Sequence, residues 1–225
     1  MDFFFLIEYS RYGMNKALDH YSSQNILAKI SRNLRILREK FAGLDITPSV
    51  DNKTLGLEEF GEEIYYAPSE RKDLRKTFTQ LNIQASDRIL DYGAGKGAAM
   101  LILDEFGFEE VAGVEVSSFL VEIARKNFRL LESEHLSIYE SDARDFHDID
   151  RFSHYYLFHP FPADVLQTVL GNIEDSLQRN PRSIQIIYYM PIHKEVLEAQ
   201  SWLKLDRVIP GGSFETRVYW ANPTN

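Results

Sequence analysis

Three glycines, Gly93, Gly95 and Gly97, alternate with other residues in the stretch DYGAGKG that begins at Asp91. Glycine adopts positive φ angles without steric cost, and it lets a ligand lie directly against the main chain. An apolar run precedes the stretch and an amphipathic run follows it, which indicates a turn from a strand into a helix. Ligands of open α/β sheets bind at such turns. We therefore expect these glycines to cradle a ligand.

The glycine pattern leaves the ligand open. It fits both the dinucleotide pattern G-x-G-x-x-G/A and the shorter pattern G-x-G-x-G. A phosphate-binding Walker loop is excluded, because Leu90 stands where its first glycine is required and Lys96 is followed by Gly97. A glycine-rich turn that binds no ligand is the remaining alternative.

Two acidic residues follow the next two apolar runs. Glu115 stands 22 positions after the first glycine, where a carboxylate can accept hydrogen bonds from both ribose hydroxyls. Asp142 ends the following run, where its carboxylate or the backbone N–H of Ala143 can read an adenine edge. The alternatives are an exposed acid at a helix start for Glu115 and a solvated acidic loop for Asp142.

The elements that must position these residues alternate between short apolar runs and amphipathic stretches. This alternation is typical of a parallel sheet covered by helices. We expect helices at 97–106, from Ser117 or Ser118 onward, and at 163–178. The expected strands are 88–93, 110–116, 136–142, 154–160, 183–191, 202–209 and 215–222. The last two form an antiparallel hairpin, so we predict a Rossmann-like α/β fold with a seven-stranded, mostly parallel sheet.

The N-terminal part of the chain has a helical pattern instead. Its apolar residues recur at three- and four-residue steps along one helix face: Ile26, Ile30, Leu34, Leu37 and Phe41. We predict an N-terminal helical segment with a connecting loop at 1–61, and one domain at 62–225. Basic residues accompany the apolar stripe, which indicates a surface for an acidic partner or, alternatively, a solvated helix face: Lys29, Arg32, Arg35, Arg38 and Lys40.

The composition excludes several classes of function. The 225 residues include no cysteine, which rules out disulfides, iron–sulfur clusters, thiolate metal sites and cysteine nucleophiles. A net charge of −9 argues against broad, sequence-independent nucleic-acid binding. The sequence shows neither a signal peptide nor the run of about 20 apolar residues that spans a bilayer. We expect a soluble, cytoplasmic protein.

On these residues, positions 62 to 225 resemble the class I S-adenosylmethionine-dependent methyltransferases. The likeness rests on Asp91 and the three glycines, the two acids after the next strands, and the terminal hairpin. It implies S-adenosyl-L-methionine as cofactor, with Gly93, Gly95 and Gly97 at its methionine portion. Asp91 would order the turn or meet the amino group of the cofactor.

The same resemblance assigns the other half of the cofactor site. It implies that Glu115 holds the ribose hydroxyls and that Asp142 and Ala143 hold the adenine. The chain is also similar to bacterial methyltransferases of uncertain substrate that carry Tyr-x-Pro, Gly-Lys-Gly and Asn-Pro-Phe. Those motifs match Tyr66-Ala67-Pro68, Gly95-Lys96-Gly97 and His159-Pro160-Phe161, with His159 in place of the usual Asn. Tyr66 is expected to close over the cofactor from its N-terminal side.

His159 is the candidate catalytic residue, because it follows the fourth strand beside the expected methyl position and imidazole accepts protons near neutral pH. The alternative is a histidine that only bonds within its turn. No metal is expected, since His159 and Met190 stand where a metal-dependent reaction would require acids.

The sequence therefore favours methyl transfer to an oxygen or nitrogen of an unidentified acceptor. One rival is an NAD(P)-binding oxidoreductase, which the glycines and Glu115 also fit. The other is a non-catalytic cofactor-binding or scaffold protein.

Overall fold

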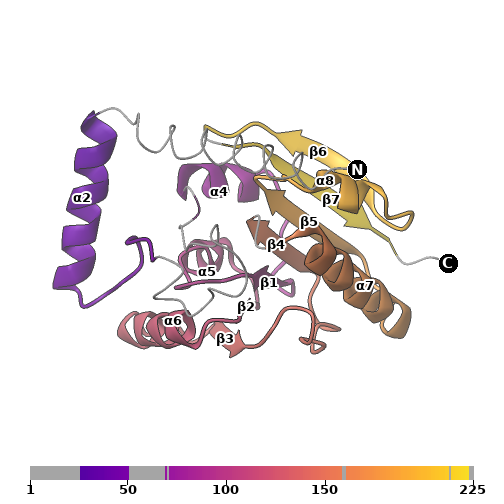
Figure 1. The fold of residues 1–225 in the computed structure, drawn as a ribbon, viewed down its shortest axis with the longest axis horizontal. Helices are drawn as coiled ribbons and strands as arrows, with labels where there is room; N and C mark the ends of the chain where they lie inside the picture. The colour runs from indigo at the N-terminus through magenta and orange to yellow at the C-terminus, as the bar shows by residue number, and fades with distance from the viewer. Residues whose placement is uncertain (1–25, 51–68, 70, 159–160, 213, 223–225) are drawn as a thin grey trace, which may run out of the picture.

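One mixed sheet organises the protein. The computed structural model describes residues 26–50, 69, 71–158, 161–212 and 214–222, without the side chains of 26–29, 31 and 32. The strands are β1 Arg88–Tyr92, β2 Glu110–Glu115, β3 Leu136–Glu140, β4 His154–Phe158, β5 Ile184–Tyr189, β6 Lys204–Ile209 and β7 Thr216–Ala221. Within these residues they form a seven-stranded sheet in the order β3-β2-β1-β4-β5-β7-β6 (Figure 1).

The strand directions confirm the predicted fold class. Strands β1 to β5 run parallel, and β7 runs antiparallel between β5 and β6. Strand β4 is buried from His154 to Leu157, as a strand covered on both faces must be. The result is a Rossmann-like α/β sheet that ends in an antiparallel hairpin.

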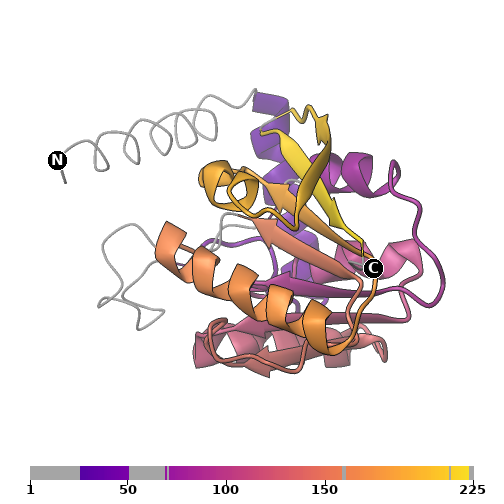
Figure 2. The same ribbon diagram turned by 90° about the vertical axis from the view of Figure 1, so that its right-hand side faces the viewer.

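Helices cover both faces of the sheet (Figure 2). One core lies under α4 (Arg71–Phe78), α5 (Met100–Leu103) and α6 (Ser118–Leu130). The other lies under α7 (Ala163–Arg179) and α8 (Lys194–Glu198). The helix predicted at 97–106 is shorter, because the glycine turn continues to Ala99. It consists of α5 and a 3-10 turn, η2 (Asp104–Phe106).

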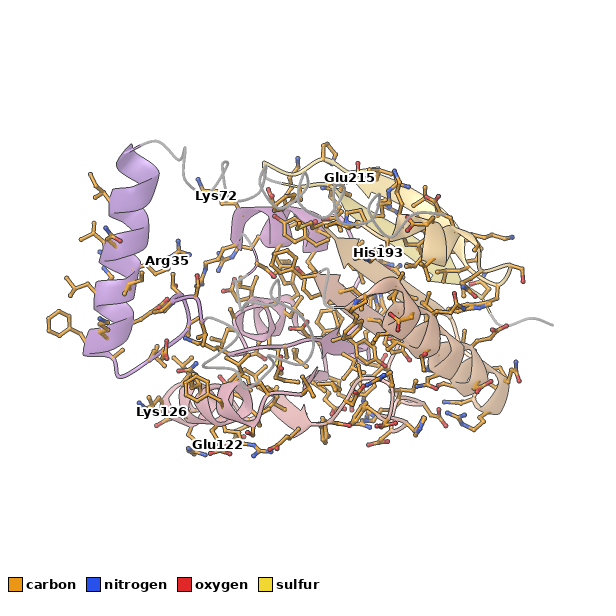
Figure 3. The ribbon with its side chains drawn as sticks, in the orientation of Figure 1. Arg35, Lys72, Glu122, Lys126, His193 and Glu215 are labelled. Carbon is orange, nitrogen blue, oxygen red and sulfur yellow. The ribbon has the colours of Figure 1, made fainter. Side chains whose placement is uncertain are left out.

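The predicted N-terminal helix is observed as α2 (Ile26–Phe41), and its earlier part lies outside the described residues. Its apolar stripe is not buried against the described residues: Leu34 is 51% exposed and Phe41 85%. In Figure 3, Arg35 lies instead on the side of α2 that faces α4 and Lys72. Both an acidic partner for this helix and a solvated charged face stay predictions. The domain boundaries also stay predictions.

No helix in the described ranges is long and apolar enough to cross a bilayer.

Candidate functional site

The glycine turn lies where the strand order of the sheet reverses. The chain passes from β1 to β2 and β3 on one side of β1, and β4 then pairs with its other side. Ligands bind beyond the carboxyl ends of the strands at such a switch point. Here Gly93, Gly95 and Gly97 have φ angles of 77°, 55° and 80°, which other residues rarely adopt. The backbone of this turn therefore requires glycine at all three positions.

Gly97 also has a packing role. A Cβ atom there would lie 2.5 Å from the ring of Phe128 on α6. Gly113 of β2 is equally restricted, since its Cβ would lie 2.5 Å from Cβ of Ala94 and 2.6 Å from Sδ of Met100. The turn thus packs closely against α6 on one side and β2 on the other. Whether Gly97 contacts a cofactor stays a prediction.

Glu115 connects the end of β2 to the glycine turn. The Gly95 N–H donates to its Oε2 at 2.9 Å, and the Ser117 N–H donates to its Oε1 at 2.9 Å. Burial raises the pKa of Glu115, while these backbone hydrogen bonds oppose the rise. The side chain is buried, so the alternative of an exposed acid is wrong. A carboxylate has about four acceptor sites, and three backbone N–H groups, of Gly95, Ser117 and Val116, act on this one, so it keeps acceptor capacity for a ligand hydroxyl.

Asp91 is a buried carboxyl group near the end of β1. It is 3% exposed, and burial, followed by the nearby charge of Glu115, raises its pKa to about 8. Such a group ionises readily only when a positive charge arrives beside it. A ligand with an ammonium group therefore suits this position.

The Tyr-x-Pro motif leads to the same region. Tyr66 lies outside the described residues, but Ser69 is described and buried. Its hydroxyl hydrogen-bonds to the hydroxyl of Tyr156 at 3.0 Å. Tyr156 of β4 stands directly opposite Asp91 of β1, and burial raises the pKa of Tyr156, with the charge of Asp91 adding to the effect. Ser69 is thus held beside Tyr156, the partner of Asp91 in the sheet.

Asp142 is placed just beyond β3, and an arginine already holds its carboxylate. The backbone N–H of Arg144 donates to Oδ1 at 2.8 Å, and its guanidinium contacts Oδ2 at 2.6 Å. The hydrogen bond from Arg144 lowers the pKa of Asp142. The Ser141 N–H donates to the Glu115 carbonyl at 3.0 Å, which brings this loop to the end of β2. Ala143 is buried, and its contact with adenine stays a prediction.

His159 lies outside the described residues, but its aromatic neighbours are fixed. Phe158 packs on Tyr189 with ring centroids 5.0 Å apart, and Phe161 packs on Tyr92 at 6.1 Å. These two contacts lie in different cores, on opposite faces of the sheet. The rings of Phe158 and Phe161 are therefore anchored on opposite faces of the sheet near the carboxyl end of β4.

The tyrosines that end β5 have structural roles. Tyr188 and Tyr189 belong to different cores, as strand alternation predicts. The Tyr189 hydroxyl donates to Asp73 of α4 at 3.0 Å, and Gly212 of the hairpin loop donates to the same carboxylate at 2.7 Å. These two hydrogen bonds to Asp73 connect α4 to β5 and to the hairpin loop.

Sequence reasoning missed two residues that shape this site. Arg144 forms an ion pair with Asp142. The only sequence signal for this pair is a basic residue two positions after the acid. Asn127 of α6 donates to the carbonyl of Lys96 at 3.2 Å. Nothing in the sequence around Asn127 indicates this contact with a turn 31 positions earlier.

No model of a protein family matches the chain, and no curated protein matches it. Solved structures do. A methyltransferase candidate from Escherichia coli superposes with a TM-score of 0.57 at 18% identity, over 69% of this chain and 89% of its own. A SAM-dependent methyltransferase from Aquifex aeolicus gives 0.55 at 15%, over 68% and 90%. An RNA methyltransferase from Salinibacter ruber, in complex with S-adenosyl-L-homocysteine, gives 0.52 at 17%, over 71% and 95%.

The chain has the class I methyltransferase fold. These identities are too low to carry a substrate or an activity from one protein to another. The candidate cofactor site of this chain consists of the glycine turn and the carboxyl groups of Asp91 and Glu115. They stand together at the carboxyl edge of β1 and β2.

Proposed function

We propose that the protein is an S-adenosylmethionine-dependent methyltransferase that acts on an oxygen or nitrogen atom of its acceptor. The observation that carries the proposal is the turn of three positive-φ glycines at the switch point of the sheet. The fold supports it, because the solved structures above are described as methyltransferases and one of them holds S-adenosyl-L-homocysteine.

The described residues fit this cofactor. The turn exposes the backbone of Gly93, Asp91 offers a buried carboxyl for the ammonium group, and Glu115 offers carboxylate oxygens for the ribose hydroxyls. The Asp142 carboxylate fits the adenine only if it shares or leaves its pair with Arg144. Tyr66 is proposed to cover the cofactor from the N-terminal side.

The chemistry asked of the protein itself is modest. S-adenosylmethionine supplies a methyl group on a sulfonium, which is already a good electrophile. The chain has to align the acceptor with that methyl group and remove a proton where one must leave. We assign an apolar wall for the acceptor to Phe158 or Phe161 and the proton transfer to a neutral His159 imidazole.

The rival functions fit less well. The usual dinucleotide-binding sheet has the order 3-2-1-4-5-6, whereas here β7 lies antiparallel between β5 and β6. The solved structures cited above are methyltransferases rather than oxidoreductases. Nothing among these findings favours a non-catalytic scaffold.

Two isosteric substitutions rank the cofactor contacts. Glu115→Gln removes a buried charge that binds the turn, so we expect S-adenosylhomocysteine to bind about tenfold more weakly, or worse. Asp142→Asn changes a carboxylate that Arg144 already holds, so we expect a loss within about threefold. Calorimetric titration of both variants measures the ranking, and the reverse order would contradict these assignments.

The catalytic assignment is tested by His159→Ala. We expect methyl transfer to fall about 100-fold or more, while the affinity for S-adenosylhomocysteine changes less than about threefold. The assay follows a tritiated methyl group from S-adenosylmethionine into a panel of hydroxyl and amine acceptors. Undiminished transfer by the variant would remove His159 from the mechanism.

A further inference from the structure

Lys96, the residue between Gly95 and Gly97, is buried inside the protein. It is only 1% exposed, and a lysine is almost never buried to this extent without a partner. Its Nζ lies 2.7 Å from Oδ1 of Asp45 and donates to the Pro48 carbonyl at 2.9 Å. The lysine therefore connects the glycine turn to the segment that follows α2.

A second residue fastens the same segment to the same turn. The Asp45 N–H donates to the side-chain oxygen of Asn127 at 3.0 Å, and the Asn127 amide donates to the Asp45 carbonyl at 2.9 Å and to the Lys96 carbonyl at 3.2 Å. Asn127 itself is fully buried. The side-chain amide of Asn127 thus binds both Asp45 of the segment and Lys96 of the glycine turn.

The same segment is also bound to α2, through Thr47. Glu39 accepts from the Thr47 N–H at 3.0 Å and from the Thr47 hydroxyl at 2.6 Å. Between the two attachments, Ile46 is buried. Residues 45–48 therefore form a strap that contacts the glycine turn through Asp45 and Pro48 and contacts α2 through Thr47 between them. We refer to the contacts of Lys96 with Asp45 and Pro48 as the latch.

Glycine positions in a turn are conformationally free unless something restrains them. On one side, the buried carboxylate of Glu115 holds the N–H of Gly95. On the other side, the latch holds the next side chain, Lys96. Glu115 therefore restrains Gly95, which has a φ of 55°, and the latch restrains the residue after it.

We propose that Lys96 is a positioning residue, which acts through the latch to hold the glycine turn in the conformation that binds the cofactor. The inference rests on the proposed function. It makes the strap part of the cofactor site, and it couples cofactor binding to the order of residues 45–48. By thermodynamic reciprocity, a cofactor that binds the latched turn better must in turn stabilise the strap.

The test begins with affinity for S-adenosylhomocysteine, measured by calorimetry at a temperature where every variant is folded. We expect Lys96→Met and Asp45→Asn each to weaken binding by about tenfold. The double variant should lose no more than the larger of the two single losses, because both substitutions break the same ion pair between Lys96 and Asp45. Asp45→Glu keeps the carboxylate on a side chain that is 43% exposed, so it should restore affinity to within about threefold.

A matched control uses another partly buried ion pair. Arg151 contacts Glu110 at 2.8 Å at the amino end of β2, and the two side chains are 24% and 22% exposed. Arg151→Met therefore also replaces a paired cation with methionine, but at the opposite edge of the sheet. It should lower the unfolding temperature while leaving the affinity for S-adenosylhomocysteine unchanged.

Hydrogen exchange supplies a readout that a purely structural contact would not change. In the wild-type protein, S-adenosylhomocysteine should slow amide exchange across residues 44–50, and Lys96→Met should abolish that effect. Wild-type affinity in the folded Lys96→Met variant would overturn the inference and leave the methyltransferase proposal intact. A wild-type protein that binds no S-adenosylhomocysteine would overturn both.

Discussion

Replacing Gly95 by valine should weaken the binding of S-adenosylhomocysteine by more than about 100-fold. Gly95 has a φ of 55°, and a β-branched residue in that conformation is strained. Its N–H is the one that donates to Glu115, so relief of the strain would displace the contact that joins the turn to β2. Calorimetric titration measures the loss directly, and circular dichroism verifies that the variant is folded.

Gly107 provides the control for this substitution. It also has a positive φ, 78°, but a Cβ atom there would meet nothing within 4 Å. Gly107→Val therefore carries a similar backbone cost of about 1–2 kcal/mol without touching the turn. We expect it to lower stability and to bind S-adenosylhomocysteine as the wild type does. Equal affinities for the two variants would show that the glycine turn is not the ligand site.

The Asp91→Asn substitution should make the protein more stable at alkaline pH and a weaker binder. The folded pKa of Asp91 is about 8, against an ordinary value of 3.8. Between these values the folded protein holds a proton that the unfolded chain releases, so stability decreases as the pH rises through this window. The asparagine side chain of the variant cannot ionise. The variant should therefore match the wild type near pH 4 and exceed its free energy of unfolding by about 3–5 kcal/mol at pH 8.

Urea denaturation of both proteins across that pH range measures the difference. A constant difference from pH 4 to pH 8 would mean that Asp91 is ionised at an ordinary pKa in the folded protein.

Binding should show the opposite trend with pH. An ammonium group beside Asp91 favours its ionised form, so the wild-type affinity for S-adenosylhomocysteine should rise up to about tenfold per pH unit below pH 8. Asp91→Asn should remove this dependence and bind about tenfold more weakly at pH 8. Calorimetry in buffers of different ionisation enthalpy should detect proton release only in the wild type. Equal proton release by the variant would assign the titration to another group.

The sheet could be predicted from the sequence because its signals are local. Apolar runs of strand length alternate with amphipathic stretches, and each of the seven expected strands is found. The positive φ angles of the glycine turn follow from the same kind of signal. The short helices α4 and α8 were not expected. In α4 only Leu74 and Phe78 supply buried apolar side chains beside four basic residues, which is too few for a periodic pattern.

The rest of the site depends on contacts between distant parts of the chain. The sequence gives no signal for the burial of Lys96, because that burial depends on Asp45, 51 positions earlier. The stripe on α2 was predicted as a helix face, and against the described residues it is exposed, with Leu34 51% and Phe41 85% exposed. Sequence periodicity gives the face of a helix and not the direction that it points.

The most direct test of the account is calorimetric titration of the purified protein with S-adenosylhomocysteine, with NADH titrated in parallel. We expect micromolar binding of S-adenosylhomocysteine, a free energy of about −8 kcal/mol, and no binding of NADH. Binding of NADH alone would contradict the methyltransferase proposal and favour an oxidoreductase. A folded protein that bound neither would leave the glycine turn without its proposed ligand.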